Sequence, residues 1–259
     1  MAEPSSSSLT VGTGEEARRI AILRREGSGA PVVWLGGFRS DMASTKASHL
    51  DLWAERQGRP MLRFDYSGHG QSEGRFEGGT IGRWLEESLA VIRHCATGRP
   101  ILVGSSMGGW IALLCARHEA LREAGLEPKA LVLIAPAVDF TEELMWKELP
   151  AQARREIEEK GKWLRPSAYS PEPYPITKNL IEEGRRHLML GGVIRLGCPV
   201  HILQGMRDPD VPWRHALTLM EHLAGDQCVI TLVSDGDHRL SREEDLARLV
   251  AAIEGFEAM

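Results

Sequence analysis

The sequence contains few cysteines, no excess of basic residues and no long apolar run. Its four cysteines, at positions 95, 115, 198 and 228, form no CxxC pair and no cluster with zinc-ligand spacing, so we expect free thiols and no metal site. The net charge of −5 argues against a nucleic-acid partner. No stretch reaches the ~18 apolar residues that a membrane-spanning helix needs.

The first residues carry no recognisable targeting signal. Residues 1–8 include one acid, Glu3, no base, and the serine run Ser5 to Ser8. This composition is typical of neither a secretory signal nor a transit peptide. We therefore predict a flexible tail over residues 1–8 and a cytoplasmic protein.

Short apolar runs alternate with longer amphipathic ones along most of the chain. This rhythm predicts βαβ units and a mostly parallel, buried sheet flanked by helices, in a single domain of the α/β class. Two earlier segments, Leu9–Val11 and Arg19–Arg24, are expected to be antiparallel edge strands. The predicted parallel strands are Val32–Leu35, Pro60–Asp65, Ile101–Gly104, Ala130–Ile134, Val200–Leu203 and Val229–Val233. The helices between them are predicted at Met42–Arg56, Ile81–Cys95, Met107–His118, Trp213–Leu223 and Arg242–Ile253.

Residues 139–196 interrupt this rhythm. They contain no good strand pattern, but two helical patches, Thr141–Lys160 and Thr177–Leu190, on either side of the proline-rich stretch Pro166–Pro175. We predict an inserted helical cap over residues 139–196, with residues 9–138 and 197–259 as the core.

The pentapeptide Gly104-Ser105-Ser106-Met107-Gly108 matches the pattern G-x-S-x-G. It follows a predicted strand and precedes a predicted helix, which is where a nucleophilic serine lies on a sharp turn. Side chains two residues before or after the serine would collide in such a turn, and both places are glycine. Ser106 is therefore the predicted nucleophile, and the neighbouring Ser105 lacks the flanking glycines.

A serine nucleophile needs a base, and a serine on such a turn is followed in sequence by an acid and then a histidine. His238 lies in the loop after the last predicted strand and is the predicted base. The acid is expected after the preceding strand, where Asp208 is preferred over Asp210, which could instead precede a helix as a cap. The other histidines fall in helix-like runs, begin a strand or precede the serine.

Two backbone N–H groups are expected to stabilise the oxyanion of the tetrahedral intermediate. One belongs to Met107, the residue after the nucleophile. The other is assigned to Phe38, in the loop Leu35-Gly36-Gly37-Phe38 after an earlier strand. Gly37 is expected to lie beside the substrate.

Together the motifs resemble those of the α/β-hydrolase-domain proteins related to the mitochondrial palmitoyl-protein thioesterase that also cleaves acyl glucuronides. The resemblance runs from about Val32 to the C-terminus and includes a cap segment, Gly161–Ser170. It is carried by Leu35-Gly36-Gly37-Phe38, Arg63-Phe64-Asp65-Tyr66-Ser67-Gly68-His69-Gly70, Leu102-Val103-Gly104-Ser105-Ser106-Met107-Gly108-Gly109-Trp110, Gly205-Met206-Arg207-Asp208, Val211-Pro212-Trp213 and Asp237-His238-Arg239.

The resemblance implies the α/β-hydrolase fold, a Ser106–Asp208–His238 triad, hydrolysis of acyl esters or thioesters, and no cofactor. Substrate contacts are expected from Trp163 and Tyr169 of the cap, with Trp146 and Tyr174 as further candidates. Plain core packing would explain each of these four aromatic residues equally well. Arg185, Arg186 and His187 would either attract an acidic substrate group or form a solvated helix face.

Three other functions stay open at this point. The fold also hosts peptidases and cofactor-free haloperoxidases, which differ in the cap and pocket, and non-catalytic ligand receptors. A dinucleotide-binding protein is disfavoured, because Gly12-x-Gly14-x-x-Ala17 follows too short a strand. The expected partner is a small-molecule or acyl-protein substrate.

Overall fold

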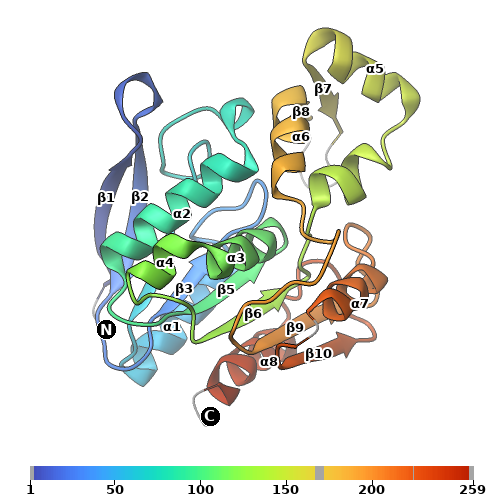
Figure 1. Cartoon of the computed structure of the whole chain (residues 1–259). Coiled ribbons are helices and arrows are strands. Elements are labelled where there is room, and N and C mark those ends of the chain that lie inside the picture. The colour runs from blue at the N-terminus through green and yellow to red at the C-terminus, as the bar shows by residue number, and fades with distance from the viewer. Residues whose placement is uncertain (1–2, 167–171, 224, 257–259) are drawn as a thin grey trace.

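An eight-stranded sheet forms the centre of the molecule (Figure 1). The computed structural model describes residues 3–166, 172–223 and 225–256. In spatial order the strands are β1 (Ser5–Val11), β2 (Arg18–Arg25), β4 (Met61–Phe64), β3 (Val32–Leu35), β5 (Ile101–Ser105), β6 (Ala130–Ile134), β9 (Val200–Gly205) and β10 (Cys228–Val233). All pairings from β4 to β10 are parallel, whereas β1 and β2 pair antiparallel, as does β2 with β4. The predicted α/β fold is thereby confirmed.

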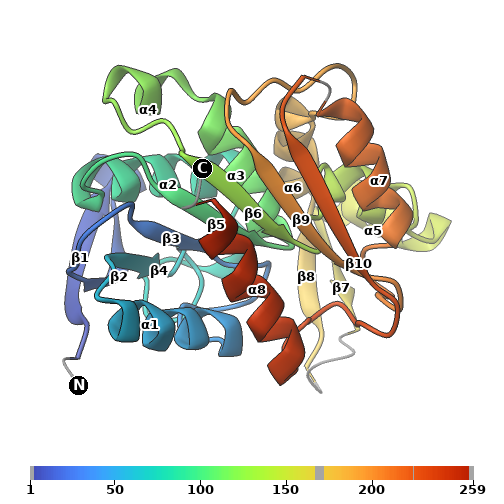
Figure 2. The same ribbon diagram turned by 90° about the horizontal axis from the view of Figure 1, so that it is seen from below.

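Helices cover both faces of the sheet (Figure 2). On one face α1 (Thr45–Gln57) and α8 (Glu243–Gly255) pack over a core that includes Trp34 and Trp53. The other face carries α2 (Ile81–Cys95), α3 (Met107–Arg117), α4 (Glu119–Glu123) and α7 (Trp213–His222) over the larger core. Because both faces are covered, strands β3, β4, β5 and β6 are buried along their whole length, which explains their largely apolar sequence.

The N-terminal segment joins the sheet from Ser5 onward, so the flexible tail predicted for residues 1–8 is wrong for Ser5–Ser8. Residues Ser5–Val11 form β1, in register with β2 from Ser5 opposite Arg24 to Val11 opposite Arg18. Strand pairing satisfies backbone N–H and C=O groups whatever the side chains are. Four exposed serines can therefore form an edge strand that their composition does not reveal.

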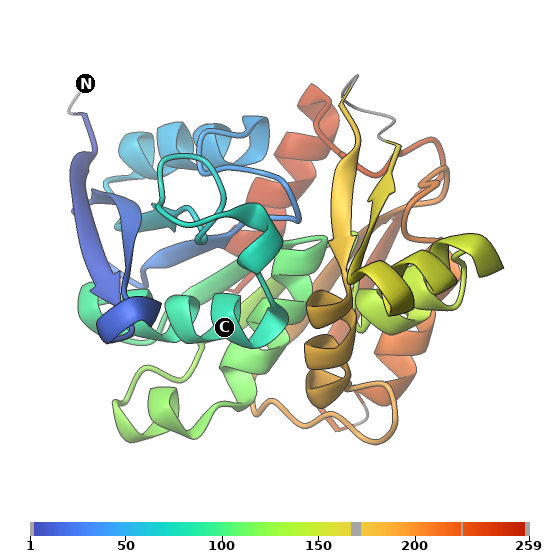
Figure 3. The ribbon, with the colours of Figure 1, turned by 90° about the horizontal axis from the view of Figure 1, so that it is seen from above.

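Residues 139–196, which we call the insert, lie between β6 and β9, and none of their described residues joins the central sheet. The insert contains a π-helix η3 (Thr141–Trp146), α5 (Ala151–Lys160), α6 (Lys178–Gly184) and a short 3₁₀ turn η4 (Arg185–His187). Figures 1 and 3 show it, in yellow to orange, above the β6–β10 half of the sheet and away from β1 and β2.

The insert is not purely helical, which corrects the expectation that it contains no strand. Strands β7 (Lys162–Arg165) and β8 (Tyr174–Thr177) pair antiparallel, with Pro175 opposite Leu164. A two-stranded ribbon has two free edges, so a proline can lie in it without breaking a ladder. The prolines in this segment are therefore compatible with paired strands, although they argue against strands in the sequence alone.

Candidate active site

Ser106 lies between the end of β5 and the start of α3, with backbone angles φ 54° and ψ −118°. A positive φ in a non-glycine residue is strained and requires support from its surroundings. The support comes from neighbouring backbone groups. The Ser106 N–H donates to Ile134 O at 2.8 Å, and its own carbonyl accepts from the Ala137 N–H at 3.1 Å. The turn is thus fastened to the end of β6.

The glycines on either side of Ser106 have no room for a side chain. A Cβ on Gly104 would lie 2.3 Å from Gly108 O, and one on Gly108 would lie 2.0 Å from Leu35 O. The collisions expected from the G-x-S-x-G pattern are therefore present. The contact with Leu35 also shows that the turn packs directly against the end of β3.

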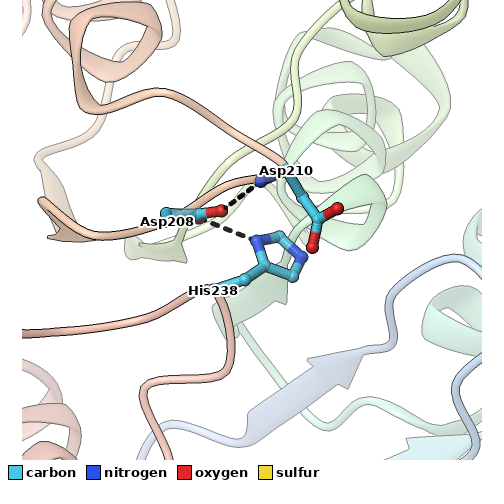
Figure 4. A group of neighbouring side chains, drawn as sticks. All are labelled: Asp208, Asp210 and His238. Carbon is cyan, nitrogen blue, oxygen red and sulfur yellow. Dashed lines mark hydrogen bonds and ion pairs between the residues drawn. The ribbon is translucent and has the colours of Figure 1, made fainter. Parts of the chain in front are cut away.

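Asp208 and His238 meet at the ends of β9 and β10 (Figure 4). Asp208 Oδ2 lies 2.8 Å from His238 Nδ1, and the Asp208 side chain is fully buried. The other oxygen of this carboxylate, Oδ1, accepts from the backbone N–H groups of Asp210 and Val211, both at 2.8 Å. An Nδ1–H facing Asp208 leaves the Nε2 of His238 free of a proton, which is the form that a general base needs.

Asp210 lies on the other side of the His238 ring (Figure 4). Asp208, Asp210 and His238 each offer one ligand atom, and these atoms lie within 4.8 Å of one another. A metal site at this place is disfavoured, because the oxygens of Asp208 already accept from backbone N–H groups and face the Nδ1 of His238. Asp208, rather than Asp210, is the acid that contacts Nδ1.

The loop after β3 runs beside the serine turn. A Cβ on Gly37 would lie 3.3 Å from Ser105 O and 3.5 Å from the Cβ of Ser106. The ring of the next residue, Phe38, packs edge-on against Phe76 at a centroid distance of 4.8 Å and also contacts Tyr174 of β8 at 6.0 Å. The loop, the serine turn and the insert therefore come together at one place.

A cavity of about 520 Å³ opens between these parts. The predicted site residues that line it are Gly37, Phe38, Ser106, Met107 and His238. Asp208 lies behind His238, buried. From the insert, Phe140, Leu144 and Met145 form an apolar wall, and Arg165 and Tyr174 also line the cavity. Its size is in the range of small-molecule sites, about 300–1,000 Å³.

The other insert residues predicted to contact the substrate do not line this cavity where the structure describes them, apart from Tyr174. Trp163 does not line this cavity. It packs, half-buried, against the larger core, two residues before the cavity residue Arg165 on β7. Tyr169 lies outside the described residues. Arg185 pairs with Glu142 at 2.7 Å and His187 with Glu183 at 2.6 Å. These two basic side chains are thus satisfied within the insert.

Sequence reasoning missed two basic groups near the site. Lys46 of α1 lines the cavity, and burial lowers its pKa to about 8. Its Nζ donates to Arg239 O, so it fastens the loop that carries His238. His69, in the loop after β4, accepts a hydrogen bond from the backbone N–H of Arg39, in the loop after β3. Its place before the serine in sequence argues against a role as the base, but its position between Gly68 and Gly70 signals a close approach of the backbone.

A mostly parallel sheet with a strained serine between strand and helix, and an acid and histidine after later strands, defines the α/β-hydrolase class. A sequence model described as "Alpha/beta hydrolase family" matches residues 28–252. The chain belongs to this family.

Comparison with individual proteins identifies similar members within this family. The mitochondrial palmitoyl-protein thioesterase ABHD10 of Bos taurus is 35% identical over 236 residues, which cover 91% of this chain and 75% of that protein. A crystal structure of a putative hydrolase from Agrobacterium vitis S4 is 49% identical, covers 98% of this chain and 99% of the other, and superposes with a TM-score of 0.94. The α/β-hydrolase domain-containing protein 10 from mouse is 32% identical, covers 98% of both chains and has a TM-score of 0.85. The resemblance inferred from the motifs is confirmed.

The same relatives correct the predicted cytoplasmic location, which is wrong. The palmitoyl-protein thioesterases of Bos taurus and Mus musculus are named as mitochondrial proteins. The expectation rested on the composition of residues 1–8, of which Ser5–Ser8 belong to strand β1. Among the described residues, no helix is both long and apolar enough to cross a lipid bilayer.

Proposed function

We propose that this protein is a serine hydrolase of acyl esters and acyl thioesters, acting through an acyl-enzyme on Ser106. The observation that carries the proposal is the Asp208–His238 hydrogen bond of 2.8 Å at a cavity whose wall includes Ser106. The palmitoyl-protein thioesterase name of the relatives from cattle and mouse supports an ester or thioester hydrolase.

The proposed reaction has two halves that mirror each other. In the first, His238 Nε2 takes the proton of Ser106 Oγ, the oxygen attacks the acyl carbonyl, and His238 protonates the leaving alcohol or thiol. In the second, water attacks the acyl-enzyme by the same route and releases the acid. Asp208 holds the ring and stabilises the imidazolium.

The backbone N–H groups of Met107 and Phe38 are the proposed oxyanion donors. Met107 begins α3, so its N–H also lies at the positive end of the helix dipole. Phe38 follows Gly37, which lies against the serine turn. Loss of one such donor costs roughly 10²–10³ in turnover.

We propose that the insert, residues 139–196, acts as a cap over the core. This core begins at Ser5, the first residue of β1, rather than at Leu9. Its apolar residues Phe140, Leu144 and Met145 provide a wall suited to an acyl chain. We propose that the acyl chain lies against this wall and that a long-chain group such as palmitoyl is accepted. Gly37 is the proposed contact to the reacting carbonyl.

A fluorophosphonate probe, which labels activated serines, tests the proposal. The parent protein should be labelled and Ser106→Ala should not. Ser105→Ala is the matched control, because Ser105 precedes the turn and lines the same cavity. Equal labelling of the parent and Ser106→Ala would refute the assignment of the nucleophile.

A panel of esters and thioesters with acyl groups from acetyl to palmitoyl separates the remaining functions. The proposed hydrolase should cleave both the esters and the thioesters, with a preference for long acyl chains. A ligand receptor of this fold would bind without turnover, and a peptidase or haloperoxidase would prefer an amide or a halide with peroxide. A strict preference for acetyl would overturn the long-chain proposal.

A further inference from the structure

The loop after β3 contains a tight turn of the uncommon kind. The Ser40 N–H donates to Gly37 O at 3.0 Å, which closes a four-residue turn over Gly37–Ser40. Arg39, at the third position, has φ 60°, whereas Phe38 is not among the residues with positive φ. This combination is a type II turn, in which the third residue is usually glycine. Arginine at this position is strained, so something outside the turn must stabilise it.

The histidine after β4 provides that support. The Arg39 N–H donates to His69 Nε2 at 3.1 Å, and His69 Nδ1 lies 3.2 Å from Ser67 O. A carbonyl can only accept, so Nδ1 carries the proton and Nε2 is a bare acceptor. The ring is 5% exposed and lies edge-on against Tyr66, Phe76 and Trp84, which fix its orientation.

Burial also keeps this imidazole neutral. It lowers the pKa of His69 to about 4. The hydrogen bond to Ser67 O opposes this shift, the charge of Arg39 adds to it, and the charge of Asp41 opposes it slightly. A protonated ring would carry a hydrogen on both nitrogens and could not accept from Arg39. The neutral form is therefore the only one compatible with the hydrogen bond to the turn.

We propose that His69 is a positioning residue for the oxyanion hole, and that its Nε2 holds the Phe38–Arg39 peptide in the type II orientation. Types I and II differ by a flip of this central peptide. The flip changes ψ of Phe38 and φ of Arg39, so it exchanges the directions of the Phe38 C=O and the Arg39 N–H. The Phe38 N–H, which is assigned to the oxyanion, belongs to the preceding peptide, so the turn acts on it through the backbone position of Phe38. The inference rests on the proposed serine hydrolase function.

Other contacts fix the loop after β3 beyond the turn, whereas His69 contacts the turn itself. The carboxylate of Asp65 accepts from the Met42 N–H at 2.7 Å, and Arg63 Nη1 donates to Met42 O at 2.8 Å. These bonds fasten the loop three residues beyond Arg39 but do not orient the Phe38–Arg39 peptide. The guanidinium of Arg39 lies over the ring of Tyr174 at 4.5 Å, so the turn also directs this side chain toward the insert.

Two substitutions of His69 separate its hydrogen bond from its bulk. In His69→Gln the Oε1 atom can occupy the place of Nε2 and accept from Arg39, whereas the shorter side chain in His69→Asn cannot reach. With a 4-nitrophenyl ester we expect His69→Gln to keep kcat within about 3-fold, and His69→Asn to lose about 10-fold or more with KM nearly unchanged. Equal kcat in His69→Asn and the parent would overturn the proposal.

A second substitution tests whether the turn is the reason. Glycine relieves the strain at positive φ and alanine does not, while both remove the guanidinium. In the His69→Asn background, Arg39→Gly should therefore restore most of kcat and Arg39→Ala should not. If glycine restores no more activity than alanine, His69 supports packing only and the proposal fails.

The remaining outcomes are also decisive. If His69→Asn does not fold, substitutions of Arg39 alone give the answer: kcat should rank Gly above Ala above Val, because a β-branched residue tolerates positive φ least. The reverse or a flat ranking refutes the role of the turn. Ser106→Ala, measured alongside, keeps the two claims apart. Activity in Ser106→Ala defeats the proposed function, whereas an inactive Ser106→Ala with a fully active His69→Asn defeats only the inference on His69.

Discussion

The neutral state of His69 predicts how the stability of the protein changes with pH. Its pKa falls from 6.5 in an exposed chain to about 4 in the folded protein, chiefly through burial. Between these values the unfolded chain binds a proton that the folded protein does not. The free energy of unfolding therefore decreases as pH falls from about 6.5 to about 4, and this contribution is complete above about pH 6.5.

The size of the effect follows from the two pKa values. At about 1.4 kcal/mol per unit, the difference between 6.5 and about 4 corresponds to about 3 kcal/mol, of which about 2 kcal/mol is lost by about pH 5. Because the ring is 5% exposed, little of this is screened by solvent. Other acids and histidines titrate in the same range, but they are shared by the parent and a variant.

The assay is urea unfolding of the parent and His69→Gln at several pH values between about 7 and about 5. Glutamine does not titrate, so its cost relative to histidine should be largest near neutral pH and should shrink by about 2 kcal/mol at about pH 5. Activity at each pH shows that the native state is intact. Parallel loss of stability in both proteins would mean that folded His69 accepts a proton, which would refute the bare acceptor at Nε2.

Three further changes test other parts of the structure. Asp208→Asn should lower kcat by roughly 10⁴-fold, since it disturbs the tautomer of His238, while Asp210→Asn stays within about 10-fold in the same ester assay; equal losses would contradict the pairing of Asp208 with the ring. Gly108→Ala should lower both the melting temperature and kcat, because its Cβ would lie 2.0 Å from Leu35 O, whereas Gly191→Ala, with nothing within 4 Å, should change neither. Glu87→Gln should cost about 3 kcal/mol in urea unfolding, because the fully buried Glu87 pairs with Arg18 at 2.6 Å. Glu86→Gln removes an exposed partner of the same arginine and should cost at most about 1 kcal/mol; equal costs would refute the role of burial.

The parallel strands and the serine turn were predictable because each depends on the residue types within a short segment of the chain. Strand β5 begins with the apolar run Ile101-Leu102-Val103. Glycine is required at positions 104 and 108 because a Cβ there would collide with the backbone of the turn or of β3. The order of Ser106, Asp208 and His238 likewise comes from the chain's own connectivity.

The errors have a common physical origin. Strand β1 depends on backbone pairing with β2, and the β7–β8 hairpin tolerates Pro175 at an open edge, so neither produces an apolar alternation. Trp163 resembles a pocket residue in sequence but packs against the core, two residues along β7 from the cavity. In each case a contact with another segment decides the structure, and that contact leaves no periodic apolar pattern in the residues themselves.

By itself, the sequence determined the class of fold, the position of Ser106 on its turn and the order of the acid and the base, because these depend on local sterics and connectivity. Only the tertiary structure decided that Asp208 rather than Asp210 contacts His238, that the insert forms one wall of the cavity, and that His69 supports the turn of Phe38 and Arg39. The reason is that these contacts join the ends of strands that are neighbours in the sheet but far apart in the chain. Their geometry exists only after the sheet has formed.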